Sequence, residues 1–181
     1  WDRNSPISSS PSQIGSTVET DSTAWNVRLS SNDDRAYVAA SASGLVIIDV
    51  SDHTNPSITE TVALDSDTAS AVAVDDVDSN AAYVYVAEWK SGLKVVDVHA
   101  PLASVVGSSD RNNERAGGVT LSSNKETLIL TRDGNGIEIF DVTDPEDPDY
   151  LDSLSHRGKA RGLVLSSDDN AAFIAAQYGG L

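Results

Sequence analysis

The amino-acid sequence predicts an all-β fold made of four tandem repeats, each with four short antiparallel strands. The first observation is a seven-residue segment that occurs three times, at residues 44–50 (GLVIIDV), 92–98 (GLKVVDV) and 136–142 (GIEIFDV). The second is that its glycine recurs about every 45 residues, and recurs once more as Gly180. The third is the absence of helical periodicity, since short apolar stretches alternate with turns rich in Ser, Asp, Asn, Gly and Pro.

Each repeat carries further strand signals on both sides of this segment. Upstream, an apolar segment precedes a polar turn at residues 26–31, 71–76, 118–123 and 162–167. A second apolar segment follows that turn at residues 36–40, 82–87, 127–130 and 171–176. Downstream, Asn-Pro and Asp-Pro steps introduce a last strand at residues 55–58 and 147–150, and residues 10–14 fit the same place.

The apolar patterns also predict how the strands are covered. The near-continuous apolar run at residues 45–50 predicts a strand buried on both faces. Residues 72–74 and 137–139 alternate instead, which predicts strands with one buried face.

Four short strands at this period are typical of a β-propeller blade. One blade cannot cover both of its apolar faces, so it needs a neighbour on each side. A closed four-bladed propeller is the alternative, but we expect the chain to be part of a larger propeller, because domain ends rarely fall inside a strand. The predicted units are residues 26–70, 71–117 and 118–161, with partial units at 1–25 and 162–181.

Two positions of the repeated segment are expected to serve the scaffold. The glycine is predicted to supply a positive φ or a close backbone approach. The aspartate of each Asp-Val pair is predicted to accept hydrogen bonds from backbone donors in the next turn. These aspartates are Asp49, Asp97 and Asp141.

Residues 44–52 (GLVIIDVSD) resemble the core motif of the LVIVD-repeat family of β-propellers, and two looser copies follow. The resemblance extends from about residue 11 to residue 181. It implies a propeller fold, commonly in exported or surface proteins of bacteria and archaea, and often within larger chains. It implies no catalytic residues, because the family shares a scaffold motif rather than a chemistry. The second copy departs from the pattern at residues 98–101 (VHAP), which affects its expected turn but not its strand.

Composition limits the function classes. Lys and Arg number 12 against 28 Asp and Glu, so the net charge is −16, and this acidity disfavours a nucleic-acid partner. No apolar run approaches the roughly 18–20 residues that cross a bilayer, so no membrane insertion is expected. The absence of cysteine excludes disulfides and thiolate sites, and the absence of methionine favours an exported protein that resists oxidation.

A search for chemistry singles out no catalytic, cofactor-binding or metal-ligating residue. His53, His99 and His156 lack a partner at metal-ligand spacing and are predicted to lie at the surface. Residues 133–136 (DGNG) lie between strands and are predicted to form a tight hairpin turn, not a phosphate loop.

Calcium is the alternative for the acidic turns. Residues 76–80 (DVDSN) resemble the opening of a calcium loop, but Ala81 and Ala87 stand where that loop needs glycine and glutamate. We therefore expect turn chemistry here and at residues 144–149, and no resident cofactor.

Three aromatic residues lie outside the strand motifs, namely Trp25, Trp89 and Tyr178. They are predicted either to contact a protein or carbohydrate partner or to fill a gap between blades. The sequence as a whole predicts a non-catalytic structural or protein-interaction module of an exported or cell-surface protein, whose partners are other protein chains or copies of itself. The alternatives are an enzyme, or a calcium-stabilised adhesin, with a site in the propeller channel.

Overall fold

The computed structural model describes residues 13–65, 68–75, 83–99, 101–110, 115–134, 136–155 and 158–177. These residues form β-strands and turns and contain no helix, which confirms the all-β prediction. It follows that no described helix is long and apolar enough to cross a membrane.

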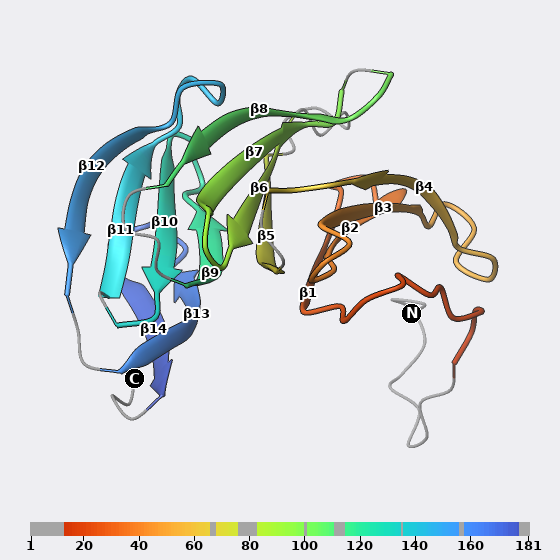
Figure 1. The fold of residues 1–181 in the computed structure, drawn as a ribbon, viewed down its shortest axis with the longest axis horizontal. Coiled ribbons are helices and arrows are strands. Elements are labelled where there is room, and N and C mark those ends of the chain that lie inside the picture. Colours follow the sequence, from red (N-terminus) through yellow and green to blue (C-terminus); the bar gives the residue numbers. More distant parts are fainter. Residues whose placement is uncertain are drawn as a thin grey trace.

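The strands form three four-stranded antiparallel sheets and one two-stranded sheet, and each sheet follows sequence order (Figure 1). Blade 1 consists of β1 (Asn26–Leu29), β2 (Arg35–Ala39), β3 (Leu45–Asp49) and β4 (Ser57–Val62). Blade 2 consists of β5 (Ala69–Asp75), β6 (Tyr83–Glu88), β7 (Gly92–Asp97) and β8 (Ser104–Ser109). Blade 3 consists of β9 (Ala116–Leu121), β10 (Thr127–Arg132), β11 (Gly136–Asp141) and β12 (Asp149–Leu154). The half-blade consists of β13 (Lys159–Leu165) and β14 (Ala172–Gln177).

The blades stand side by side along an arc, with their first strands on the inside (Figure 1). Consecutive first strands contact one another, from β1 to β5, from β5 to β9 and from β9 to β13. The last strands, β4, β8 and β12, form the outer edges of the sheets. This is the arrangement of propeller blades around an axis, as the repeats predict.

Most of the core lies between neighbouring blades, and a smaller cluster on blade 1 packs against Val18. Tyr37 of blade 1 is fully buried in the cluster that contains Val84 and Val86 of blade 2. The equivalent Tyr85 of blade 2 is fully buried against Leu128 of blade 3. Each blade thus supplies the cover that its neighbour needs, which explains why the repeats occur in tandem.

This packing corrects the prediction that the strands at residues 72–74 and 137–139 have one buried face. Val72 and Ala73 of β5 are both buried, although they point to opposite faces. In β11, Glu138 is as buried as Ile137, because blade 2 covers its face and Arg132 pairs with its carboxylate. Alternation therefore does not report exposure where a blade lies on either side. The prediction for residues 45–50 holds over Leu45–Ile48, where all four residues are buried.

The scaffold roles of the repeated segment are confirmed. Gly44, Gly92 and Gly136 have φ angles of 76°, 69° and 90°. Asp49 accepts a hydrogen bond from the amide of Ser51 at 2.9 Å, and Asp97 and Asp141 accept the equivalent bonds from His99 and Thr143. Hydrogen bonds from the hydroxyl and amide of Ser51 lower the pKa of Asp49, and those from Thr143 lower the pKa of Asp141.

Candidate binding site at the axial pocket

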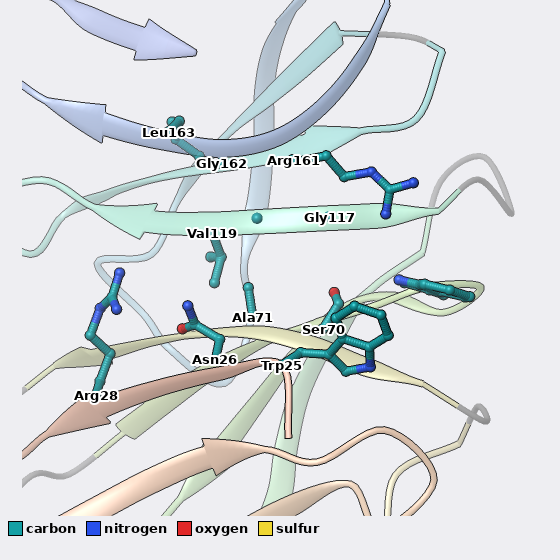
Figure 2. Close-up of a pocket in the computed structure, with 12 residues that line it drawn as sticks. Trp25, Asn26, Arg28, Ser70, Ala71, Gly117, Val119, Arg161, Gly162 and Leu163 are labelled. Atoms are coloured by element: carbon teal, nitrogen blue, oxygen red, sulfur yellow. The ribbon is translucent and has the colours of Figure 1, made fainter. Parts of the chain in front are cut away.

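A pocket of about 260 Å³ lies at the inner edge of the blades, where their first strands begin (Figure 2). We call it the axial pocket. Each of the four sheets contributes to its lining, so it is a product of the repeat architecture and not of one loop.

The repeats differ at the position that opens onto this pocket. When the first-strand segments 26–31, 71–76, 118–123 and 162–167 are aligned, the residues just before them are equivalent, and all four line the pocket: Trp25, Ser70, Gly117 and Arg161. Two positions later the equivalent residues are Val27, Val72, Val119 and Leu163, which are uniformly apolar. The side chains that face the pocket therefore differ from blade to blade, whereas the side chains two positions later are alike.

An aromatic pair stands at one side of the pocket. The ring of Trp25 lies 6.1 Å from that of Trp89 at a tilt of 43°. The guanidinium of Arg115 lies 4.5 Å from the Trp89 ring centroid, within cation–π range. Trp89 belongs to the β6–β7 hairpin, where its amide donates to the carbonyl of Thr68 at 3.0 Å. Trp25 stays 52% exposed, so this pair forms part of the surface and does more than fill a gap between blades.

The opposite wall is formed by β9 and β13. A side chain at Gly117 would meet the carbonyl of Ala160 at 2.7 Å, so glycine allows the two strands to approach closely. At Gly162 a Cβ would meet nothing within 4 Å, because this residue faces the open pocket. Beside it, Arg161 is 45% exposed, and its guanidinium lies 3.5 Å from the carboxylate of Asp133.

A second hollow, of about 310 Å³, adjoins the axial pocket and shares Arg28 and Val119 with it. Its far end is marked by Lys125, whose ammonium donates to the carbonyl of Val74 at 3.4 Å. The charged side chains among the described residues that line the two hollows are Arg28, Lys125 and Arg161, and all three are basic.

The other candidates of the sequence do not gather at this site. His53 and His99 are exposed, as predicted. His156, Tyr178 and the acidic residues 76–80 lie outside the described residues. Within residues 144–149, Asp144 accepts a hydrogen bond from the amide of Glu146 at 3.1 Å, as turn chemistry requires. Across the described ranges, no three His, Cys, Asp or Glu residues lie together as a group that could hold a metal ion.

Sequence reasoning singled out the two tryptophans but missed the basic residues of the pocket. Arg28 and Arg161 look like ordinary surface cations when each repeat is considered by itself. The signal was available in the comparison of equivalent positions, where Arg161 takes the place of Ser70 and Gly117.

Comparison with known proteins gives the fold. The family model described as LVIVD repeat matches residues 22–63 and 73–106, which cover blade 1 and most of blade 2. No curated protein matches the chain. Among solved structures, one chain of "Crystal Structure of Mitotic Checkpoint Complex", a WD40 propeller, is similar with a TM-score of 0.71 and 14% identity. The match covers 84% of this chain and 48% of that chain, so this chain spans about half the length of its structural neighbour. Residues 22–63 and 73–106 therefore match LVIVD repeats, and the described residues fold as the blades of a β-propeller.

Proposed function

We propose that this propeller segment is a non-catalytic protein-interaction module that binds a segment of a partner protein in the axial pocket. The observation that carries the proposal is the half-exposed Trp25, held against Trp89 beside an open pocket. Tryptophan is enriched among the residues that dominate binding energy at protein interfaces. A tryptophan side chain has only two χ angles and therefore loses little conformational freedom on binding.

The size and setting of the pocket support this proposal. A volume of about 260 Å³ suits one or two side chains of a partner and is small for a drug-sized substrate. The matched WD40 propeller is, by its title, part of a protein complex, which is consistent with such a use of the fold.

The proposal includes an exported or cell-surface location. It is supported by a chain without cysteine or methionine and with a net charge of −16, which suits an oxidising and dilute environment. Protease added to intact cells of the source should remove the protein. Full protection until the cells are lysed would contradict this location.

The experiment is a selection of phage-displayed peptides on the immobilised 181-residue chain. We expect enriched peptides whose affinity falls about 30-fold with Trp25→Ala, the loss of about 2 kcal/mol that marks a central interface residue. Leu151→Ala is the matched control, since Leu151 is 55% exposed but lies on the outer strand β12. Failure to enrich peptides, or peptides that bind the Trp25→Ala variant as tightly as the wild type, would refute the proposal.

A further inference from the structure

From the charges around the axial pocket we infer that the bound partner segment is acidic, with carboxylate side chains that pair with Arg28 and Arg161 next to an apolar contact on Trp25. This inference rests on the proposed function and specifies its ligand. It starts from a contrast between the chain and its pocket, because the chain carries a net charge of −16 whereas the charged lining is basic.

The two arginines are placed to hold separate carboxylates. Arg28 comes from β1 and Arg161 from β13, and they flank the pocket on either side of Asn26 (Figure 2). Arginine binds a carboxylate through two parallel N–H donors, and such bidentate pairs are stronger than neutral hydrogen bonds. A ligand with two spaced carboxylates therefore satisfies both ends of the pocket.

The contact between Arg161 and Asp133 leaves N–H donors of the arginine available for a ligand. Asp133 is nearly buried, and its carboxylate reaches one terminal nitrogen of Arg161 at 3.5 Å. A guanidinium has five N–H donors, so donors remain for a ligand on the 45% of the side chain that is exposed. Asp133 thus fixes the position of the guanidinium before the ligand arrives, which reduces the entropy lost on binding.

The shape of the site favours a chain segment over a small anion. The axial pocket and the adjoining hollow share Arg28, so basic groups occur at one end, in the middle and at the far end, from Arg161 through Arg28 to Lys125. A single inorganic anion contacts one of these groups, whereas an extended peptide with several carboxylates contacts them in succession. The apolar contact on Trp25 adds a requirement that phosphate or a free amino acid does not meet.

The test uses three labelled nine-residue peptides with a central tyrosine, flanked on each side by four residues that are all Glu, all Gln or all Lys. Their affinity for the intact 181-residue chain is measured by fluorescence anisotropy. We expect the Glu peptide to bind at least about tenfold more tightly than the Gln peptide, and the Lys peptide not to bind. Equal binding of the Glu and Gln peptides would overturn the inference.

Variants assign the effect to named residues. Arg28→Gln combined with Arg161→Gln should reduce the Glu peptide to the affinity of the Gln peptide, while Arg35→Gln, an exposed arginine of β2, should change nothing. An unchanged Glu/Gln ratio in the double variant would also overturn the inference. Gly162→Leu should block both peptides, because a Cβ at this position has open space and the side chain extends into the pocket.

Two further outcomes separate the proposals. If peptides bind in a Trp25-dependent manner without preference for Glu, the proposed function stands and the acidic ligand is wrong. If inorganic phosphate or free glutamate displaces the Glu peptide at a concentration near the Kd of that peptide, the site takes small anions and the peptide proposal is wrong.

Discussion

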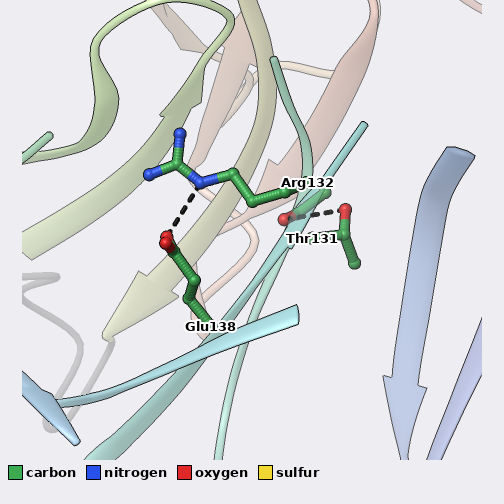
Figure 3. A network of polar contacts seen from close by, with 4 residues as sticks. Thr131, Arg132 and Glu138 are labelled. Carbon is green, nitrogen blue, oxygen red and sulfur yellow. Dashed lines mark hydrogen bonds and ion pairs between the residues drawn. The ribbon is translucent and has the colours of Figure 1, made fainter. Parts of the chain in front are cut away.

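The buried ion pair of blade 3 offers a quantitative test of how the blades are held together. Arg132 has no exposed surface and the side chain of Glu138 is 3% exposed, with 2.8 Å between Arg132 Nε and Glu138 Oε2 (Figure 3). Both face blade 2, where the guanidinium lies close to Gly92. We predict that Glu138→Leu lowers the free energy of unfolding by about 3–5 kcal/mol, because the guanidinium stays buried without this carboxylate.

A second substitution that removes the buried Arg132 charge should restore the stability lost in Glu138→Leu, and blade 1 shows which residues fit. Blade 1 has Ala40 and Val46 at the positions equivalent to Arg132 and Glu138, so a blade accepts an apolar pair there. The double variant Arg132→Met, Glu138→Leu removes both charges and roughly preserves the volume. Replacement of a buried ion pair by apolar residues is often neutral or stabilising, so we expect the double variant to return to within about 1 kcal/mol of the wild type.

The measurement is urea unfolding followed by tryptophan fluorescence and by circular dichroism, with the m-value checked for each variant. An unchanged m-value shows that the denatured state is comparable, and the difference between single and double variants then gives the coupling energy. The reasoning is refuted if Glu138→Leu costs less than about 1 kcal/mol, or if the double variant is as unstable as the single one.

Three further predictions concern the scaffold. Gly92→Ala should lower the free energy of unfolding in urea by about 1–3 kcal/mol, because a φ of 69° is unfavourable for alanine. The control Gly162→Ala has open space around the added Cβ and should leave the free energy of unfolding unchanged. Equal losses in the two variants would contradict this prediction. Ser70→Ala should cost about 1 kcal/mol, since the hydroxyl donates from blade 2 to the carbonyl of Ala116 in blade 3 at 2.8 Å; a neutral effect would contradict it. Hydrogen bonds from Ser166 and Asn170 lower the pKa of Asp168 from 3.8 to about 2, so the unfolded state binds the proton first. The stabilisation that ionised Asp168 gives the folded state is then complete above about pH 4 and is lost as the pH falls through about 2. Thermal melts should show the melting temperature of the wild type falling over this range, and that of Asp168→Asn falling less. Equal falls in the two proteins would refute the prediction.

The sequence predicted those features of the fold and the site that depend on residues close together in the chain, and it missed those that depend on a neighbouring blade. Gly44 and Asp49 act within their own turns, so their positive φ and backbone hydrogen bonds were predictable from neighbouring residues. The burial of Glu138 depends on a blade formed by other residues, and strand alternation carries no information about that blade. The site lies between these cases. The equivalence of Trp25 and Arg161 is present in the sequence, but only the inner position of the first strands shows that both face one pocket.

The equivalent positions at the start of the first strands allow the lining of the pocket to change by single substitutions. Each blade and the half-blade place one of these residues at the pocket, while other residues form the turns and the core of that blade. The four residues are Trp25, Ser70, Gly117 and Arg161. The four positions are not equally free to change. Ser70 bonds blade 2 to blade 3, and glycine at position 117 allows β9 and β13 to approach closely. Trp25 and Arg161 are about half exposed, so substitutions there should alter the pocket and leave the packing between blades largely as it is. Under the proposed function, duplication of a repeat followed by point mutation at either of these two positions would therefore suffice to change the partner.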